Sequence, residues 1–278
     1  MAGMIDLHTH SKKSDGSLWP KELIARASEL GLSALALTDH DTVDGLDEAL
    51  EASKNFGLQF VPGVELEIEN EGGEFHLLGL GLKNWHDELY EKLVKLKRIR
   101  LERNHIIFGK IRDSGIPARF EEVEQLAGDD IIARPHFAKL LVEKGAAYSL
   151  QDAFNKYLDV GKPFYESKKN LSPVEAFELI RAAGGYPVLA HPLSLKLSWV
   201  ELEKKLGELK SLGLSGVESY YSSYSLKNCR RLSKMARRQG LLCSAGSDFH
   251  GSFKENKELG RLAGGKKIPD KYLNPFLD

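Results

Sequence analysis

The sequence predicts an α/β fold in which parallel strands alternate with helices, and two features of the chain indicate it. First, short apolar runs alternate with longer segments of helical spacing; the run Leu32–Leu37, for example, lies between the predicted helices 19–31 and 44–56. Near-continuous apolar runs are typical of parallel strands that are covered on both faces. Second, polar side chains directly follow several of these runs, and parallel barrels place their chemistry at the carboxyl ends of the strands.

The first part of the chain contains four apolar runs and two helical segments. A buried strand is predicted at 4–7, and further runs lie at 59–61 and 75–80. Pro20 in the first turn and Gly31 at the end delimit the first helix, and Gly57 ends the second. Pro62 and Gly63 follow the strand at 59–61, so we expect that strand to be short.

The alternation returns at residue 172. Ser172 and Glu175 have the spacing of a capping box, in which each residue satisfies a backbone N–H of the other, so a helix is predicted from there to about 183. The elements predicted after it are helices at 199–212 and 226–239 and strands at 186–190, 216–219 and 241–245. The tail after Lys254 gives little indication of its structure.

The middle of the chain reads differently, because strand-like runs are scarce there. Helical spacing is seen at 88–112, 120–127, 136–145 and 149–158. We therefore predict a barrel domain formed by 1–86 and 165–278, with a small helical insertion at 87–164. The many cations of Lys92–Arg112 have two interpretations, a solvated helix face or an edge that attracts phosphate.

Composition limits the class of protein. The 278 residues have a formal net charge of −1, which argues against a globally basic nucleic-acid footprint. Two cysteines allow at most one disulfide, and neither a signal peptide nor an apolar run of membrane-spanning length is evident. We expect a cytoplasmic protein with no membrane association, and no obligate protein partner is indicated.

Histidines and carboxylates follow the predicted strands in pairs. His8 and His10 come after the first strand, and Asp248 and His250 follow the last with the same spacing of two. In an extended chain, residues two apart point to the same side, so each pair can aim at one point. Neutral imidazole and carboxylate are good ligands for divalent metals.

The complete set of candidate ligands contains six histidines and three carboxylates. A single metal ion needs four to six ligands, so the set suggests two or three ions that share bridging groups. Ligation by nitrogen and oxygen without thiolate suits manganese, iron or zinc. The candidates are His8, His10, Asp15, His40, Glu65, His76, His191, Asp248 and His250.

One motif in the helical segment points to phosphate. Arg134-Pro135-His136 offers a guanidinium fork that matches phosphate oxygens, next to a predicted helix start. Because proline disfavours helical backbone in the residue before it, we expect Arg134 to lie outside the helix and His136 to begin it.

Together these motifs resemble those of the polymerase and histidinol phosphatase (PHP) family of phosphoesterases, in the family's order and from the N-terminus to about residue 251. The matching pieces are Asp6-Leu7-His8-Thr9-His10, Ser14-Asp15-Gly16, Thr38-Asp39-His40-Asp41, Pro62-Gly63-Val64-Glu65, His76, Ala190-His191-Pro192 and Ser247-Asp248-Phe249-His250-Gly251. The resemblance implies a distorted, mostly parallel (β/α) barrel of about seven strands.

The resemblance also implies how the ligands are shared. It assigns one metal to His8, His10, Glu65 and Asp248, and a second to Asp15, His40 and His250. A third would be held by Glu65, His76 and His191. His191 and Asp248 are thereby expected to serve both the metals and catalysis.

Members that carry a similar helical insertion with Arg-Pro-His are nucleotide-directed phosphatases, acting on 3',5'-nucleotide bisphosphates or AMP, and a 5'-to-3' exoribonuclease. This subgroup implies that Arg134 and His136 contact the substrate phosphate, with Lys168 and Lys169 as weaker candidates. The expected partner is a small phosphorylated molecule, most simply a nucleotide, and a short oligonucleotide is the alternative.

The expected reaction is therefore hydrolysis of a phosphomonoester by a metal-bridging hydroxide. Ser or Cys nucleophiles do not stand out in the sequence. Three alternatives stay open at this point: an exoribonuclease that uses the same metals, a metal-binding module without catalysis, and a phosphatase for amino-alcohol phosphates.

Overall fold

A computed structural model describes residues 3–70, 72–128, 132–167, 170–254 and 256–277. The chain divides into two compact units, one of Met1–Leu93 with Asn170–Asp278 and the other of Val94–Lys169. The second unit thus begins within a helix, a few residues after position 87; the domain assignment made from the sequence stays a prediction. In the described part of the chain, no helix combines the length and the apolar character needed to cross a membrane.

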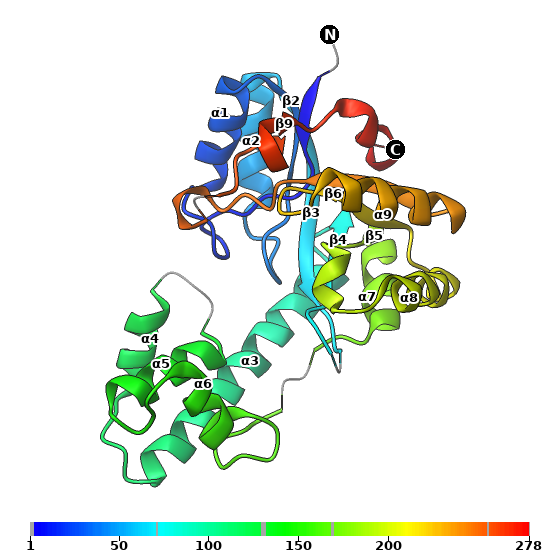
Figure 1. Cartoon of the computed structure of the whole chain (residues 1–278). Helices are drawn as coiled ribbons and strands as arrows, with labels where there is room; N and C mark the ends of the chain where they lie inside the picture. Colours follow the sequence, from blue (N-terminus) through cyan, green and yellow to red (C-terminus); the bar gives the residue numbers. More distant parts are fainter. Residues whose placement is uncertain (1–2, 71, 129–131, 168–169, 255, 278) are drawn as a thin grey trace. The chain divides into compact units, whose positions relative to one another are not determined.

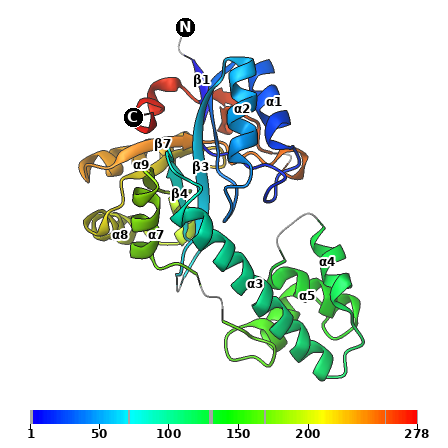
Figure 2. The same ribbon diagram turned by 180° about the vertical axis from the view of Figure 1, so that it is seen from behind.

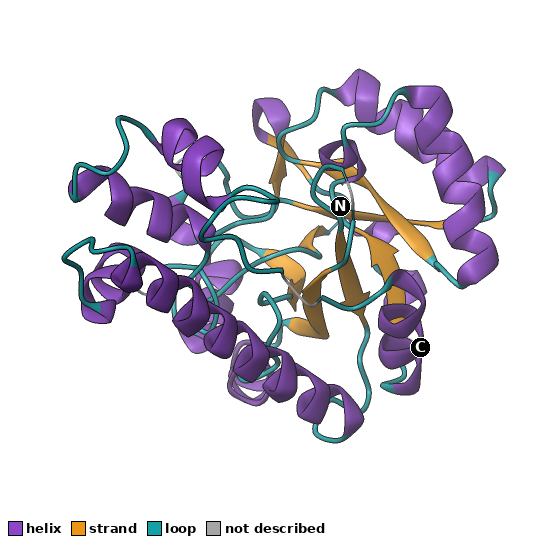
Figure 3. Ribbon diagram, turned by 90° about the horizontal axis from the view of Figure 1, so that it is seen from below, coloured by secondary structure: helices purple, strands orange, loops and turns teal. Residues whose placement is uncertain are grey.

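The first unit is a nearly closed barrel of seven strands, which confirms the predicted fold (Figure 3). The strands pair in sequence order: β1 Met4–Asp6, β2 Leu32–Leu37, β3 Gln59–Glu67, β4 His76–Leu80, β5 Tyr186–Leu189, β6 Gly216–Tyr221 and β7 Leu242–Gly246. The chain after β1 meets the chain after β7, since the His10 amide donates to the Phe249 carbonyl at 2.9 Å and the Leu7 amide to the Ala245 carbonyl at 3.2 Å. These bonds bring the first and last strands together.

β4 is antiparallel to both of its neighbours, whereas the other pairs are parallel. A parallel pair needs a long crossover, but β3 and β4 are joined directly by a short connection without a helix. Because β4 is reversed, its first residue, His76, lies at the same end of the barrel as the last residues of the parallel strands. This reversal distorts the barrel and at the same time adds a residue to that end.

β3 is longer than the sequence suggested, so the prediction that it ends near residue 61 was wrong. Pro62 is the last residue of the ladder with β2, opposite Leu37, and the ladder with β4 begins at Gly63. Beyond it, Glu65 still forms a parallel bridge with His40 on the β2 side. Because Pro62 lies at the end of one ladder and before the start of the other, its missing N–H removes little from either. Gly63 fits because an added Cβ would lie 2.9 Å from the Gly79 carbonyl oxygen.

Five amphipathic helices pack around the strands (Figure 1). α1, for example, buries Leu23, Ile24 and Ala27, and Gly57 ends α2 in the left-handed region with φ of 60°. The predicted capping box is confirmed, because Ser172 and Glu175 exchange hydrogen bonds at the start of α7. The bounds are α1 Pro20–Glu29, α2 Leu46–Phe56, α7 Pro173–Ala182, α8 Trp199–Leu212 and α9 Leu226–Arg238.

The last part of the tail, residues 268–276, packs against the opposite end of the barrel from the ligand residues, which the sequence did not indicate. Ile268, Tyr272 and Phe276 share one apolar cluster with the strand residues, and the Ile5 amide donates to the Ile268 carbonyl at 3.0 Å. The tail contains a strand pair, β8 Arg261–Leu262 and β9 Lys266–Lys267. Its short 3-10 helices are η4 Ala263–Gly265, η5 Asp270–Tyr272 and η6 Asn274–Phe276, and η2 Pro192–Leu195 and η3 Gly251–Phe253 lie earlier in the chain.

In the described residues of the second unit, the regular secondary structure is helical (Figure 2). Its core contains Ile107, Ile111, Val123 and Phe137. The helices are α3 Glu88–Asp113, which begins in the first unit, α4 Phe120–Ala127, α5 Arg134–Glu143, α6 Leu150–Ala153 and the π-helical turn η1 Phe154–Leu158.

The prediction that α5 starts at His136 was wrong, because the helix begins two residues earlier, at Arg134. Pro135 therefore lies inside the first turn, where backbone N–H groups have no partner within the helix and a proline removes no bond. His136 stabilises this start, since its Nδ1 accepts from the Ala133 amide at 3.0 Å.

Candidate metal centre

All nine candidate ligands lie in the first unit, and most come from one end of the barrel. His8 and His10 follow β1, His40 follows β2, His191 follows β5, and Asp248 with His250 follows β7. Glu65 lies within β3, His76 begins β4, and Asp15 lies in the loop before α1. The structure thus brings together residues that are up to 242 positions apart, and the topology alone explains why.

A first group surrounds one carboxylate oxygen of Glu65. Glu65 Oε2 lies 3.0 Å from His8 Nε2 and 3.1 Å from His10 Nε2, and these two nitrogens are 3.1 Å apart. Asp248 Oδ1 lies 3.2 Å from His10 Nε2. Two ligands of one zinc-sized ion, each about 2.1 Å from it, lie roughly 3 Å apart, so this spacing fits a shared cation.

A second group gathers around Asp15. Its Oδ2 lies 3.0 Å from His250 Nε2 and 3.9 Å from His40 Nε2. His10 also faces this group, with Nδ1 3.5 Å from Asp15 Oδ1, and this buried nitrogen makes no hydrogen bond to any residue that the structure describes. A neutral imidazole has one lone-pair nitrogen, so His10 can bind a cation through Nε2 or through Nδ1, and the other nitrogen carries the proton.

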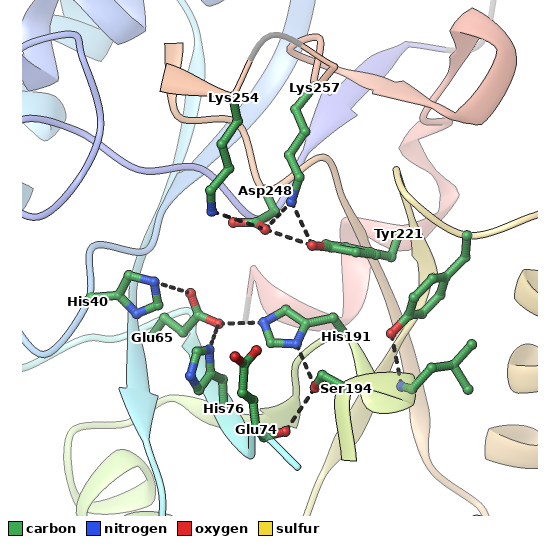
Figure 4. A pocket seen from close by; sticks show the side chains of 12 residues that line it. His40, Glu65, Glu74, His76, His191, Ser194, Tyr221, Asp248, Lys254 and Lys257 are labelled. Carbon is green, nitrogen blue, oxygen red and sulfur yellow. Dashed lines mark hydrogen bonds and ion pairs between the residues drawn. The ribbon is translucent and has the colours of Figure 1, made fainter. Parts of the chain in front are cut away.

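A third group uses the other oxygen of Glu65 (Figure 4). Glu65 Oε1 lies 3.0 Å from both His76 Nδ1 and His191 Nε2. When the residues are grouped by the distances between their ligand atoms, His40 belongs with Glu65 and His76, and His191 is outside that group. His10 belongs to the Asp15 group as well as to the first. The grouping therefore differs in detail from the one the family resemblance implies, and the ligand roles stay predictions.

The backbone is strained at two of these residues. His191 has φ of 25° and Asp248 φ of 57°, both in the left-handed region that favours glycine. Hydrogen bonds hold them there: the His191 amide donates to Glu218 Oε2 at 2.7 Å and the Asp248 amide to the His8 carbonyl at 2.8 Å. Strain of this kind persists where the surrounding structure fixes the chain, and it is common at functional sites.

The electrostatics of the centre are those of acids and imidazoles buried side by side. Burial would raise the pKa of the Glu65 carboxyl, but the surrounding imidazoles hold it well below its ordinary value. Burial lowers the pKa of His40 to about 4. For His10, burial also acts to lower the pKa, but hydrogen bonds to Asp248 and Glu65 outweigh it and raise the pKa to about 9. Glu65 is thus ionised and His40 neutral, as metal binding requires, whereas a metal would displace the proton of His10.

Two residues that orient this centre, Glu218 and Asp39, were not predicted from the sequence to do so. Glu218, in β6, accepts from His8 Nδ1 at 2.9 Å, which leaves His8 Nε2 to face the cluster. Asp39 accepts from the Ser11 amide and from the Ser11 and Ser14 hydroxyls, so it holds the loop that carries Asp15. The signal for Glu218 was a carboxylate inside a predicted strand, but a single such residue has no spacing to another ligand that could be compared.

A pocket of about 490 Å³ opens at the cluster. Tyr221, from the end of β6, lines it and donates a hydrogen bond to Asp248 Oδ2 at 2.7 Å, and the Leu193 amide donates to the Tyr224 hydroxyl at 2.9 Å. The other lining residues are His40, Glu65, Glu74, His76, His191, Ser194, Lys254 and Lys257. Five of the nine candidate ligands therefore line an opening that a small molecule could enter.

The residues predicted to contact substrate lie in the helical unit. Arg134 is half-buried, with its guanidinium carbon 5.8 Å from the centre of the Tyr165 ring. His136 is buried at the start of α5. Lys168 and Lys169 lie outside the described residues. Their role at a substrate phosphate stays a prediction based on family resemblance.

The fold and the clustered ligands define a class, that of the metal-dependent phosphoesterases built on a mostly parallel barrel. Residues 6–165 match the family model described as the PHP domain, and the chain belongs to this family. It is thus an enzyme that acts on phosphoric esters, and the module without catalysis is set aside.

Relatives along nearly the whole length support this assignment. A 3',5'-nucleoside bisphosphate phosphatase from Chromobacterium violaceum is 35% identical over 92% of this chain and 90% of its own length. A 5'-3' exoribonuclease from Haemophilus influenzae is 35% identical over 90% of this chain and 91% of its own. A solved structure from Bifidobacterium adolescentis, described as a metal-dependent phosphoesterase, has a TM-score of 0.74 and 28% identity, covering 100% of this chain and 96% of that one.

Proposed function

We propose that this enzyme removes a phosphate group from a nucleotide, with a 3',5'-nucleoside bisphosphate as the first candidate substrate. The observation that carries the proposal is a cluster of eight nitrogen- and oxygen-donor residues, joined by His191 through its contact with Glu65, beside an open pocket. The similarity to the bisphosphate phosphatase of Chromobacterium violaceum, at nearly full length, supports the choice of substrate. A cytoplasmic location is proposed from composition alone.

The proposed cofactors are two or three divalent ions of manganese, iron or zinc, held by the nine ligands. The fit rests on the mixed set of nitrogen and oxygen donors and on their spacings near 3 Å. When bound, such ions lower the pKa of a coordinated water and neutralise charge on phosphoryl oxygens.

The protein's own residues orient and shield this chemistry. Glu65 presents one oxygen to each side of the cluster, so it is suited to bridging. Glu218 fixes the orientation of His8 from β6, and Tyr221 holds Asp248 through its hydroxyl. These buried contacts keep the ligands in place before the substrate arrives, which lowers the reorganisation required during reaction.

Phosphate release from adenosine 3',5'-bisphosphate with Mn²⁺ tests the proposal. We expect turnover in the purified protein, and a loss of at least about 100-fold in Asp248→Ala and in His191→Gln, since each removes a metal ligand. Lys267→Met, at the other end of the barrel, is the control and should match the unaltered protein. Undiminished turnover in both ligand variants would refute the catalytic assignment.

A second candidate, exoribonuclease action on short RNA, is favoured by α9. This helix begins two residues after Tyr224, which lines the pocket, and none of its residues is acidic. Its exposed cations are Lys227, Arg230, Arg231, Lys234, Arg237 and Arg238. A steep salt dependence with 5'-phosphorylated RNA, together with faster turnover than on the mononucleotide, would favour this candidate, because each phosphate contact adds to the salt slope.

A further inference from the structure

Two lysines face the pocket from one side. Lys254 and Lys257 come from the segment after η3, and both line the pocket with Tyr221 and Asp248. Figure 4 shows both ammonium groups directed at Asp248, while Glu74 lies on the far side of the pocket. The pocket is therefore polarised, with cations on one wall and a carboxylate on the other.

The contacts place both charges at the proposed metal ligands. Lys257 Nζ donates to the Tyr221 hydroxyl at 2.6 Å and also to Asp248 Oδ2, and its side chain is 11% exposed. Lys254 Nζ lies 2.8 Å from His250 Nε2 and 3.8 Å from Asp248 Oδ2, with its side chain 42% exposed. Lys257 is fixed by two partners, whereas Lys254 has more freedom to reach into the pocket.

Charge decides what these lysines can bind. The ligand carboxylates Asp15, Glu65 and Asp248 carry three negative charges, and two divalent ions would carry four positive ones. Two ammonium groups beside such a centre increase its net positive charge, which favours the binding of an anion. A phosphomonoester dianion supplies two negative charges and several acceptor oxygens, whereas a phosphodiester supplies one charge.

We propose that Lys254 and Lys257 bind the phosphoryl oxygens of the substrate and make the centre selective for phosphomonoesters over phosphodiesters. The inference rests on the proposed function and deepens it, because it names the charge state that the pocket accepts. It assigns phosphate binding to the barrel unit itself, separately from Arg134.

The test compares two esters with the same leaving group. The variants are Lys254→Met/Lys257→Met, the charge-preserving Lys254→Arg/Lys257→Arg, and the control Lys267→Met from the exposed strand β9 at the opposite end of the barrel. Each is assayed with Mn²⁺ on p-nitrophenyl phosphate and on bis(p-nitrophenyl) phosphate. Calorimetry measures the binding of inorganic phosphate, and elemental analysis measures the bound metal.

We expect the double methionine variant to keep its metal, to lose roughly tenfold or more in phosphate affinity and to raise KM for the monoester as much, since it removes two charged hydrogen-bond donors. Its KM for the diester should change less than threefold, and the control should resemble the unaltered protein. The arginine variant, which keeps both charges, should recover part of the phosphate affinity that the methionine variant loses. Unchanged phosphate affinity, equal losses on both esters, or loss of metal would overturn the proposal. Absence of metal-dependent turnover in the unaltered protein would instead refute the proposed function, and phosphate binding would still test the lysines.

Discussion

Glu218 illustrates how a residue without a ligand role can determine the properties of its neighbours. One of its oxygens accepts from His8 Nδ1 and the other from the His191 amide, so one buried carboxylate orients two proposed ligands. The candidate ligands and their places after the strands could be predicted from the sequence, because residue type alone shows which side chains can bind a metal. The residue that orients a ligand could not be predicted, because Glu218 and His8 belong to strands that are far apart in the chain.

Replacing Glu218→Gln should lower metal affinity by about 10- to 100-fold, as is usual for a residue that orients a histidine ligand. The amide keeps the shape but removes the charge that stabilises the His8 N–H. Titration with Mn²⁺ followed by calorimetry measures the change, and Glu208→Gln on exposed α8 is the matched control. Equal affinity in both variants would mean that Glu218 does not orient the site.

Metal binding should release protons and strengthen as pH rises. The pKa of His10 is raised to about 9, so below that pH the imidazole holds a proton that the metal must displace. The apparent affinity should therefore fall steadily as pH is lowered from about 9. Calorimetry in two buffers of different ionisation enthalpy counts the protons released, and a count of zero at pH 7 would contradict this expectation.

At the scale of elements, the ends of the strands set the geometry of the centre. β2 and α8 were predicted to the residue, because apolar runs and capping signals are local. β3 and α5 were not, since Pro62 and Pro135 occupy places where their missing N–H is harmless, and only the neighbouring strand or turn reveals this. Rules based on neighbouring residues thus predicted the ends of an element only where its packing in the fold did not override them.

Gly246 ends β7 beside the cluster and tests how tightly this end is packed. A Cβ there would lie 2.2 Å from the His8 Cβ and 2.8 Å from Glu218 Oε1, so Gly246→Ala forces both side chains to move. We expect a loss of about 1–3 kcal/mol in the free energy of unfolding, together with weaker metal binding.

Gly207→Ala, in the middle of α8, provides the comparison, because the nearest atom that its Cβ would meet outside the helix is Gln239 Oε1, 3.5 Å away. It should be neutral or stabilising by up to about 1 kcal/mol. Denaturant unfolding of both variants measures the difference, and equal stability would show that the end of β7 is loosely packed.

At the scale of the whole molecule, the two ends of the barrel have separate roles. The tail packs on one end and the ligands gather at the other, and neither the closure between β1 and β7 nor the place of the tail could be predicted from the sequence. Both depend on contacts such as that between Asp6 and the Ser247 amide, 241 residues apart. The barrel of about seven strands was predicted from the family resemblance, which depends on the order of the motifs. The periodicity of apolar residues indicated only alternating strands and helices.

This separation predicts that stability and metal binding can be changed independently. Phe276 is buried in the tail's cluster, so Phe276→Ala should cost about 3–5 kcal/mol of unfolding free energy while the folded protein keeps its metal affinity. Leu277→Ala, at an exposed neighbour, should cost under about 0.5 kcal/mol. Loss of metal affinity in the folded Phe276 variant would show that the two ends are coupled.

The most direct measurement is the metal content of the purified protein, determined together with its phosphatase activity before and after chelation. We expect two or three divalent ions per chain, loss of turnover when they are removed and recovery when Mn²⁺ is added back. A chain that binds no divalent ion, or that turns over phosphomonoesters equally well after chelation, would contradict a metal centre at this end of the barrel.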